Sequence, residues 1–218
     1  MPVEFVRAVD HVGWGAYTQT LTIDATGGNY ILAFVSIRRG NDQIISGVTF
    51  NGDNLSPIGS QLNPGSIAGH VFGMATPDQG SYELTVTLTG DTASVYLAGV
   101  VFSGVSAVGT REDWSDVTTT AVEATDTVTS ETNGLVVTCC CVQGDVSGSL
   151  ASAAGQTTRE GPAAAGADHT GIVSTKAGSA SVTMGHTWTG GARALQIMVP
   201  ITPAGAPSTF VPQIIMIG

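Results

Sequence analysis

Charged residues are unusually few in this sequence. Only 11% of its 218 residues are Asp, Glu, Lys or Arg, whereas about 25% is usual for a soluble domain. Seven residues are basic and 17 are acidic, which gives a formal net charge of -10. The basic residues are scattered, and Arg38-Arg39 is the only adjacent pair. Because no basic stripe could follow a phosphate backbone, we expect no nucleic-acid partner.

Long apolar runs and helical periodicity are missing as well. No segment approaches the roughly 18 consecutive apolar residues that a membrane helix needs. The start of the chain carries Glu4 and Asp10 where a signal peptide would have its apolar core. No apolar period of 3.6 persists over the roughly 10 to 12 residues of a stable helix. We therefore expect no membrane partner, no signal peptide, and synthesis in the cytoplasm.

Cysteine occurs only as the run Cys139-Cys140-Cys141. Neighbouring strand residues point to opposite faces, so adjacent thiols cannot easily form a disulfide. A metal site would need further His or Cys ligands at a suitable spacing, and none is near in the sequence. We interpret the run as a reduced, buried strand in which Cys acts as a small hydrophobe. The sequence thus predicts a reducing compartment, no metal and no cofactor.

The chain is rich in Gly, Thr and Val and in strand patterns. Ser81–Val105 is the clearest stretch, because Tyr82, Leu84, Val86 and Leu88 alternate with polar residues. After Gly90-Asp91, residues 94–102 are apolar or small at nearly every position, which is typical of a strand buried on both faces. We predict that the two runs pair as a hairpin at the centre of a β-sandwich.

Further strands are predicted at short, even intervals, separated by turn residues. In chain order these strands are Thr18–Asp24, Tyr30–Ile37, Ile44–Phe50, Leu55–Ile58, Ala68–Ala75, Thr118–Thr129, Leu135–Val142, Thr170–Ser174, Ala180–Trp188 and Arg193–Thr202. Asn51-Gly52 predicts a two-residue hairpin turn that leads into Leu55–Ile58. Thr118–Thr129 is interpreted as an edge strand, and Leu150–Gly166 as a loop around a short strand near Gln156–Arg159. The pattern predicts an all-β fold, an antiparallel and jelly-roll-like β-sandwich over residues 1–202.

Residues 203–218 differ in character from the rest. Pro203, Pro207 and Pro212 favour an extended chain and exclude a central strand. The segment then ends in Gln213-Ile214-Ile215-Met216-Ile217, an apolar run that would be an aggregation hazard if left free. We interpret residues 203–218 as an extended C-terminal arm. It either folds back on its own sheet or, as we prefer, adds to a neighbouring subunit.

Six motifs follow one another along the chain: VTFNGDNLSPIG (Val48–Gly59), Gly80–Gly90, Ala98–Val105, NGLVVTC (Asn133–Cys139), AGQTTR (Ala154–Arg159) and STKAGSASVTMGHTW (Ser174–Trp188). In this order they resemble a β-sandwich module of phage virion structural proteins, which include capsid decoration and tail-associated proteins. The resemblance covers roughly residues 18–202. His186 departs from it, because the family tends to keep a small polar residue there, and so does the appended arm. The family brings no shared catalytic residues.

The histidine and carboxylate residues give little reason to expect an enzyme. His70 and His186 fall within predicted strands, and His169 falls in a predicted loop beside Asp168. We interpret all three as structural, because no nucleophile elbow accompanies them. The carboxylate pairs Asp113/Asp116 and Glu123/Asp126 are interpreted as solvated side chains, and residues 51–54 as a turn rather than a calcium loop. We therefore expect no enzyme and no catalytic residues.

Exposed apolar residues are the better candidates for function. Trp14 and Trp114 lie in loop-like sequence, whereas Trp188 falls on a strand and is expected in the core. Together with the apolar residues of the arm, they are the candidate subunit contacts, because aromatic and apolar side chains are favoured at interfaces: Trp14, Trp114, Phe210, Ile214, Ile215, Met216 and Ile217.

The resemblance and the exposed apolar residues together point to the virion. They imply a structural, non-enzymatic part of a phage particle, most simply a capsid decoration or cement protein. Its partners would be copies of itself, as a homo-oligomer, and other virion proteins such as the major capsid protein. The alternative is an adhesin module, on a tail or fibre, that binds host-surface glycans through exposed aromatic residues. Without a signal peptide, the chain would reach the outside of the cell as part of a particle released by lysis.

Overall fold

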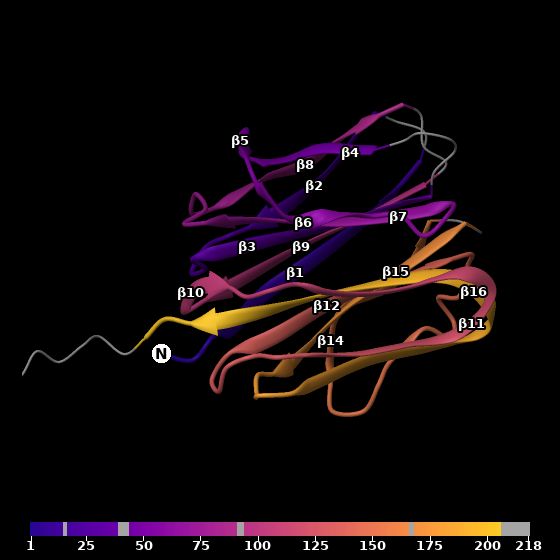
Figure 1. The fold of residues 1–218 in the computed structure, drawn as a ribbon. Coiled ribbons are helices and arrows are strands. Elements are labelled where there is room, and N and C mark those ends of the chain that lie inside the picture. Colours follow the sequence, from indigo (N-terminus) through magenta and orange to yellow (C-terminus); the bar gives the residue numbers. More distant parts are fainter. Residues whose placement is uncertain (15–16, 39–43, 91–93, 166–167, 206–218) are drawn as a thin grey trace, which may run out of the picture.

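A computed structural model describes residues 1–14, 17–38, 44–90, 94–165 and 168–205. Within these ranges the chain forms sixteen strands and no helix. The strands pair in antiparallel fashion into three sheets that lie one above another (Figure 1). The predicted all-β antiparallel sandwich is therefore confirmed. The described part of the chain contains no helix long and apolar enough to cross a membrane.

The three sheets differ in size, and we name them by their place in the stack. The outer sheet consists of β2 (Thr18–Asp24), β8 (Ser81–Thr89), β4 (Ile44–Phe50) and β5 (Asp53–Asn54). The central sheet consists of β1 (Glu4–Gly13), β9 (Ser94–Ser103), β3 (Tyr30–Arg38), β7 (Ile67–Ala75) and β6 (Ser56–Leu62). The wide sheet follows the order β10 (Val105–Val108), β16 (Val182–Pro203), β12 (Leu135–Gln143), β15 (His169–Ala177) and β14 (Thr157–Ala165), while β11 (Glu112–Val128) and β13 (Ala151–Ser152) pair with β16.

Sequence pattern decides which strands are central. Residues 31–37 of β3 and 94–102 of β9 are buried at every position, because the outer sheet covers one face and the wide sheet the other. In β2 and β8, by contrast, buried and exposed residues alternate, since only one face meets the core. The strands predicted at Tyr30–Ile37 and Leu135–Val142 are confirmed as β3 and β12, and each of them pairs with a strand on both sides.

The hairpin predicted over Ser81–Val105 is wrong. β8 pairs with β2 and β4 in the outer sheet, whereas β9 pairs with β1 and β3 in the central sheet. An alternating strand can be solvated on one face, but a strand that is apolar on both faces needs a layer on each side. Placing the two strands in different layers satisfies both patterns, so they face each other across the core instead of pairing.

Other boundaries are corrected in a similar way. Asn51 and Gly52 do make a two-residue turn, with φ of 51° and 87°, but β5 is short and the chain then crosses to the central sheet as β6. The short strand predicted near Gln156–Arg159 is the start of the nine-residue β14, and the stretch interpreted as a loop before it contains β13. The strands predicted at Ala180–Trp188 and Arg193–Thr202 are one continuous strand, β16.

The length of β16 produces a fourth layer. Its later part, residues 194–201, pairs with β12 within the wide sheet, while its earlier part, residues 182–192, pairs with residues 121–128 of β11. This second pair, joined by β13, folds over the wide sheet, and we call it the ribbon. Small apolar clusters fill the space beneath it, with Ala124, Val128, Met184 and Trp188 on the ribbon side. The edge position predicted for Thr118–Thr129 agrees, because β11 pairs with β16 alone among the described strands.

Candidate functional site

The predicted contact residues lie in different settings. Trp14 follows the end of β1 and is 50% exposed, and its carbonyl accepts a hydrogen bond from the Gln19 side chain. Trp114 is not in a loop, as predicted, but in β11, where it is half-buried against the cluster beneath the ribbon. Trp188 is buried as expected, and its indole N–H donates to the carbonyl of Ala121. Phe210, Ile214, Ile215, Met216 and Ile217 lie outside the described residues.

Besides Met1, which is 74% exposed, sequence reasoning missed three large apolar side chains that are exposed in the described part of the chain. Tyr17, at the start of the turn into β2, is 57% exposed. Val117 and Val122 on β11 are 60% and 49% exposed. Between Asp116 and Ala121 the pairing of β11 with β16 is interrupted, so residues 117–120 bulge out at the corner where the ribbon folds over. The bulge could not be foreseen, because it depends on where β16 turns from one layer into the next.

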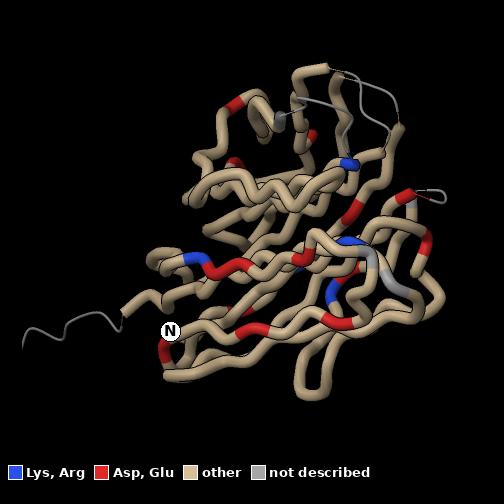
Figure 2. The backbone as a smooth tube through the Cα atoms, turned by 45° about the vertical axis from the view of Figure 1, so that its right-hand side comes forward, with Lys and Arg blue, Asp and Glu red and all other residues tan. Residues whose placement is uncertain are grey.

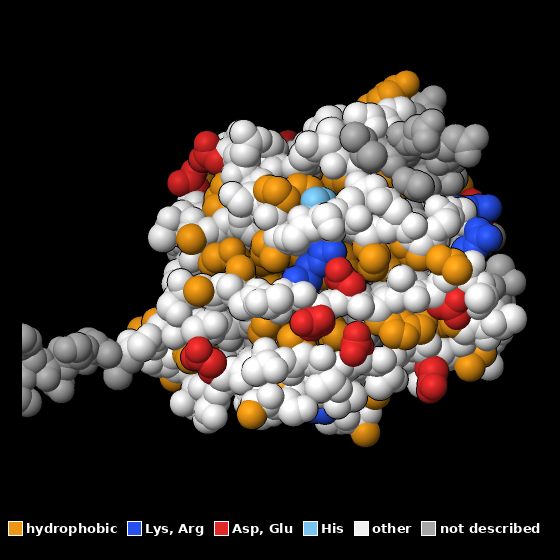
Figure 3. Space-filling model, viewed as in Figure 1, with side chains coloured by type: hydrophobic (Ala, Val, Ile, Leu, Met, Phe, Trp, Pro, Cys, Tyr) orange, Lys and Arg blue, Asp and Glu red, His pale blue; other side chains and the backbone are white. Residues whose placement is uncertain are grey.

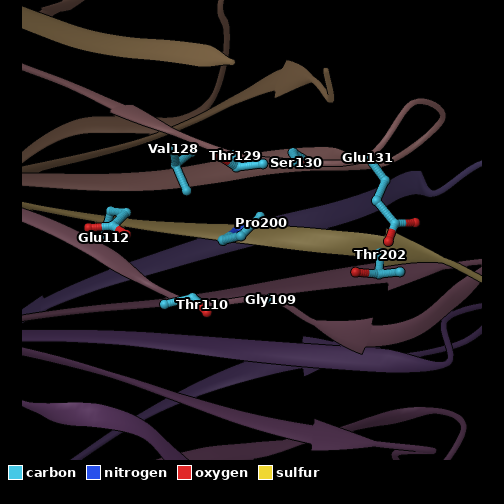
Figure 4. A pocket seen from close by; sticks show the side chains of 9 residues that line it. All are labelled: Gly109, Thr110, Glu112, Val128, Thr129, Ser130, Glu131, Pro200 and Thr202. Atoms are coloured by element: carbon cyan, nitrogen blue, oxygen red, sulfur yellow. The ribbon is translucent and has the colours of Figure 1, made fainter. Parts of the chain in front are cut away.

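A groove opens beside the ribbon. It has a volume of about 430 Å³, in the range of ligand pockets. Figure 4 shows that its floor comes from β16 and its two sides from the two ends of β11, which the fold-over brings opposite each other. Its lining mixes apolar, hydroxyl and carboxylate groups: Gly109, Thr110, Glu112, Val128, Thr129, Ser130, Glu131, Pro200 and Thr202.

A second hollow continues from the first along the seam between the central and wide sheets. Gly109 and Thr110 line both, and Arg111 lies in the second. The Arg111 guanidinium donates to the carbonyls of Ile58 and Ser60 on β6, each at 2.7 Å, and to Asp113 at 2.6 Å. Arg111 therefore ties the edges of two sheets together. Figure 3 shows this face of the molecule, on which apolar side chains lie in bands.

Away from Arg111, charged residues are few and are spread over the described backbone (Figure 2). Asp113 is paired with Arg111, so one member of the proposed carboxylate pair Asp113/Asp116 has a structural partner. Glu123 is exposed and Asp126 half-buried on β11. Among the residues that the structure describes, no group of three or more His, Cys, Asp or Glu side chains is placed to hold a metal ion.

All four histidines lie on strands, and each has a structural partner; that of His11 on β1 is the Gln19 side chain, 3.2 Å away. His70 lies 2.9 Å from the carbonyl of Gly59, and burial lowers its pKa. His169 begins β15 and is fully buried, although it was predicted in a loop, and it lies 3.1 Å from the hydroxyl of Ser36. His186 donates from Nδ1 to Gln196 at 2.8 Å. Burial lowers its pKa to about 4, against a smaller opposing effect of that hydrogen bond.

The thiols are free and buried, as the sequence predicts. Cys139 and Cys141 share a face of β12, with their sulfur atoms 3.7 Å apart, while Cys140 faces the ribbon. Burial raises the pKa of Cys139. Burial also acts to raise the pKa of Cys141, but hydrogen bonds from Cys139 and then His169 outweigh it and bring the value to about 6. With 3% exposure or less, these thiols face other side chains and not solvent.

Comparisons with known proteins give no family. No protein-family model matches the chain, and none of the curated proteins compared with it matches. A conserved protein of unknown function from Pseudomonas aeruginosa PAO1 aligns over 92% of this chain and 100% of its own, with 9% identity and a TM-score of 0.33. A chain from the atomic structure of Sulfolobus turreted icosahedral virus aligns over 91% of this chain and 61% of its own, with 11% identity and a TM-score of 0.31. At such TM-scores, the two likenesses carry no argument about fold or function.

Proposed function

We propose that this protein is a structural, non-enzymatic component of a phage virion, most simply a capsid decoration or cement protein. The observation that carries the proposal is the corner of the ribbon, where the side chains of Val117 and Val122 are exposed on a layered scaffold. Burying such side chains against a neighbour stabilises a contact by about 25 cal/mol per Å². The partners in this proposal are copies of the same chain and the major capsid protein.

The motifs that resemble phage virion modules support the same proposal. They fall on β4, β8, β9 and β12 and around β13 to β16, which are scaffold strands of all three sheets. The resemblance therefore concerns the frame, and the surface residues that make contacts lie between the motifs. This division is what a family of particle proteins needs, because one frame can present different contact residues.

Particle composition tests the proposal. Particles released by lysis from cells that carry the gene should contain this chain at a fixed ratio to the capsid protein, as measured by mass spectrometry of gradient-purified material. A Val117→Asp/Val122→Asp variant should fold but be depleted from particles, since both side chains are exposed. The control is Thr125→Asp/Thr127→Asp, which changes exposed residues of the same strand. Absence of the wild-type chain from particles would overturn the virion role, and full retention of the first variant would overturn the contact.

A glycan-binding role on a tail or fibre is favoured by a different observation. Trp14 and Tyr17 are two exposed aromatic residues three positions apart at one end of the stack. Exposed aromatic rings supply large contact surfaces for a ligand at low cost in conformational entropy. A glycan array probed with wild-type protein and with Trp14→Ala/Tyr17→Ala should show binding that the variant loses at least tenfold. No binding by the wild type would exclude this role.

A further inference from the structure

The edges of the three sheets differ in whether they can accept another strand. An open edge presents unpaired N–H and C=O groups, and proteins usually block it with prolines, bulges, charges or very short strands. β6 and β14 contain Pro57 and Pro162, and β5 has two residues. β10, β11 and β14 show register shifts along their pairing, and β1 combines such a shift with three charged side chains. These edges are therefore poorly suited to regular pairing.

β2, at the edge of the outer sheet, carries no such device. Its seven residues, TQTLTID, include no proline and no lysine, and they pair with β8 without a shift from Thr18 to Asp24. The charged residue, Asp24, ends the strand and is bound by Arg7 at 2.6 Å. Among the described strands, β8 alone pairs with β2. The other edge of β2 is therefore available to a further strand.

The main-chain groups on this edge can be assigned. Leu88 N–H donates to the carbonyl of Tyr17 at 2.8 Å, in the same register as β2 and β8. Bonded pairs alternate along an antiparallel ladder, so the odd-numbered residues of β2 bond to β8. The N–H and C=O groups of Thr18, Thr20 and Thr22 therefore point to the open edge, where no described residue bonds to them.

The side chains of β2 have the same pattern in both directions from Leu21. Thr20 and Thr22 are exposed, whereas Gln19, Leu21 and Ile23 are buried. If β2 meets a second β2 in antiparallel fashion about Leu21, Thr20 lies opposite the partner subunit's Thr22, and buried positions meet buried positions. A two-fold axis makes identical strands antiparallel, so the same edge supplies both sides of the contact.

We propose that β2 binds β2 of a second copy of this chain, antiparallel about Leu21, so that the two outer sheets become one. Up to about eight main-chain hydrogen bonds then join the two edges. The two Asp24 side chains lie at opposite ends of the contact, so they do not repel each other at close range. A partner strand must match β2 in length, low charge and alternation, and a second β2 matches in all three by identity.

Two exposed aromatic side chains adjoin the same edge. Trp14 and Tyr17 lie just before β2 and are 50% and 57% exposed. In the proposed register residue 17 comes opposite residue 25 of the second copy, next to the turn at Gly27, where an added Cβ would meet nothing within 4 Å. Aromatic residues are enriched at interfaces, and their burial adds area that one pair of strands lacks. This use of the two rings excludes the glycan role.

This proposal deepens the assembly role proposed above, and purified full-length protein tests it apart from particles. The wild type should form a reversible dimer in sedimentation equilibrium. Thr20→Pro removes an N–H that points to the open edge but none that bonds to β8, so it should weaken the dimer at least about tenfold. Thr20→Val keeps this N–H and the β-branched shape and should associate like the wild type. Circular dichroism checks that both variants are folded.

Hydrogen exchange measures the same edge in the wild-type chain. The amides of Thr20 and Thr22, followed by NMR, should exchange at least about tenfold more slowly at protein concentrations where the dimer forms than where the monomer prevails. The amide of Leu21, which faces β8, should be protected at both concentrations. This measurement decides the matter even if Thr20→Pro does not fold, because it needs no substitution.

Three outcomes would overturn the proposal. The wild type could remain monomeric, or Thr20→Pro could associate as tightly as Thr20→Val. A dimer could also form in which the Thr20 and Thr22 amides exchange as fast as in the monomer, which would place the contact on another surface. None of these results bears on whether particles contain the chain, so failure here and failure of the virion role are distinguishable.

Discussion

The interior between the outer and central sheets differs from the interiors on either side of the wide sheet. The first is filled by aliphatic side chains with Phe50 and Phe72, and its buried polar residues Gln19 and His70 sit at the margins, each 8% exposed. Around the wide sheet, His169 and His186 are 0% exposed. Further polar side chains around the wide sheet are also 0% exposed, among them Tyr96, Thr138, Thr170, Ser174 and Gln196.

The difference shows two ways of holding layers together. Hydrocarbon packing needs only area and shape, so it tolerates small shifts of one sheet over another. Buried polar groups need particular partners, because an unpaired one costs about 1–3 kcal/mol. Gln196, for example, joins the wide sheet to His186 of the ribbon, and Ser174 lies 3.3 Å from the same ring. These contacts give the ribbon a defined position as well as stability.

Phe50→Ala should have the largest effect, because it removes a ring from the hydrocarbon interior. Phe50 is 1% exposed and packs edge to face with Tyr82, with ring centroids 5.7 Å apart. We expect the free energy of unfolding to fall by about 3–5 kcal/mol, as measured by urea denaturation. Tyr17→Ala, at an exposed position, should change it by less than about 0.5 kcal/mol. Similar losses for both variants would contradict the core that we describe.

Acid should act on the polar interior beneath the ribbon. The pKa of His186 is about 4 in the folded protein, below the ordinary 6.5, so the unfolded chain binds an additional proton between these values. The contribution of neutral His186 to the free energy of unfolding is therefore fully present above pH 6.5 and is lost as the pH falls towards 4. A shift of one pKa unit corresponds to 1.36 kcal/mol, so the shift from 6.5 to about 4 corresponds to about 3 kcal/mol.

His186→Gln isolates this contribution from that of the carboxylates. Unfolding free energies of both proteins, measured by urea denaturation from pH 7 to pH 4, should give a steeper decline for the wild type. Phe50→Ala lowers stability without touching the histidine and should keep the wild-type slope. Parallel curves for wild type and His186→Gln would show that the histidine does not titrate beneath the ribbon.

Gly171→Ala should have the smallest effect of the three and tests the packing of Tyr96. A Cβ atom at residue 171 would lie 2.5 Å from the Tyr96 ring, so the ring or the strand must shift. We expect a loss of about 1–3 kcal/mol in unfolding free energy. Gly47→Ala on β4 meets nothing within 4 Å and should be neutral or stabilise by up to about 1 kcal/mol. Equal losses from the two substitutions would point to backbone effects and not to Tyr96.

The sequence could predict strands and burial, because both follow from side chains close together in the chain. Alternation in Thr18–Asp24 and continuous apolar character in Leu135–Val142 gave the correct strands with one and two buried faces. The thiols were correctly predicted to be buried and free. Strand β1 was missed, and β14 was predicted only as a short strand near Gln156–Arg159, because polar residues such as Asp10 and Glu160 weaken their patterns.

The sequence could not predict the candidate site. The groove unites Thr110, Glu131 and Pro200, which are far apart in the chain and meet only because β11 and β16 fold over together. The apolar residues of the arm predict a docking segment, and that prediction falls on residues outside the described part of the chain. The bulge with Val117 likewise depends on a register shift that no local pattern records.

The sequence by itself determined that this is an all-β protein with a low-charge surface and buried, reduced cysteines. Those properties depend on hydrophobic periodicity and composition, which each strand carries locally. Only the tertiary structure decided that there are three sheets, that β8 and β9 lie in different ones, and that the ribbon creates a groove. The physical reason is that pairing partners are chosen by the burial of whole faces, and a face is complete only when distant strands have come together.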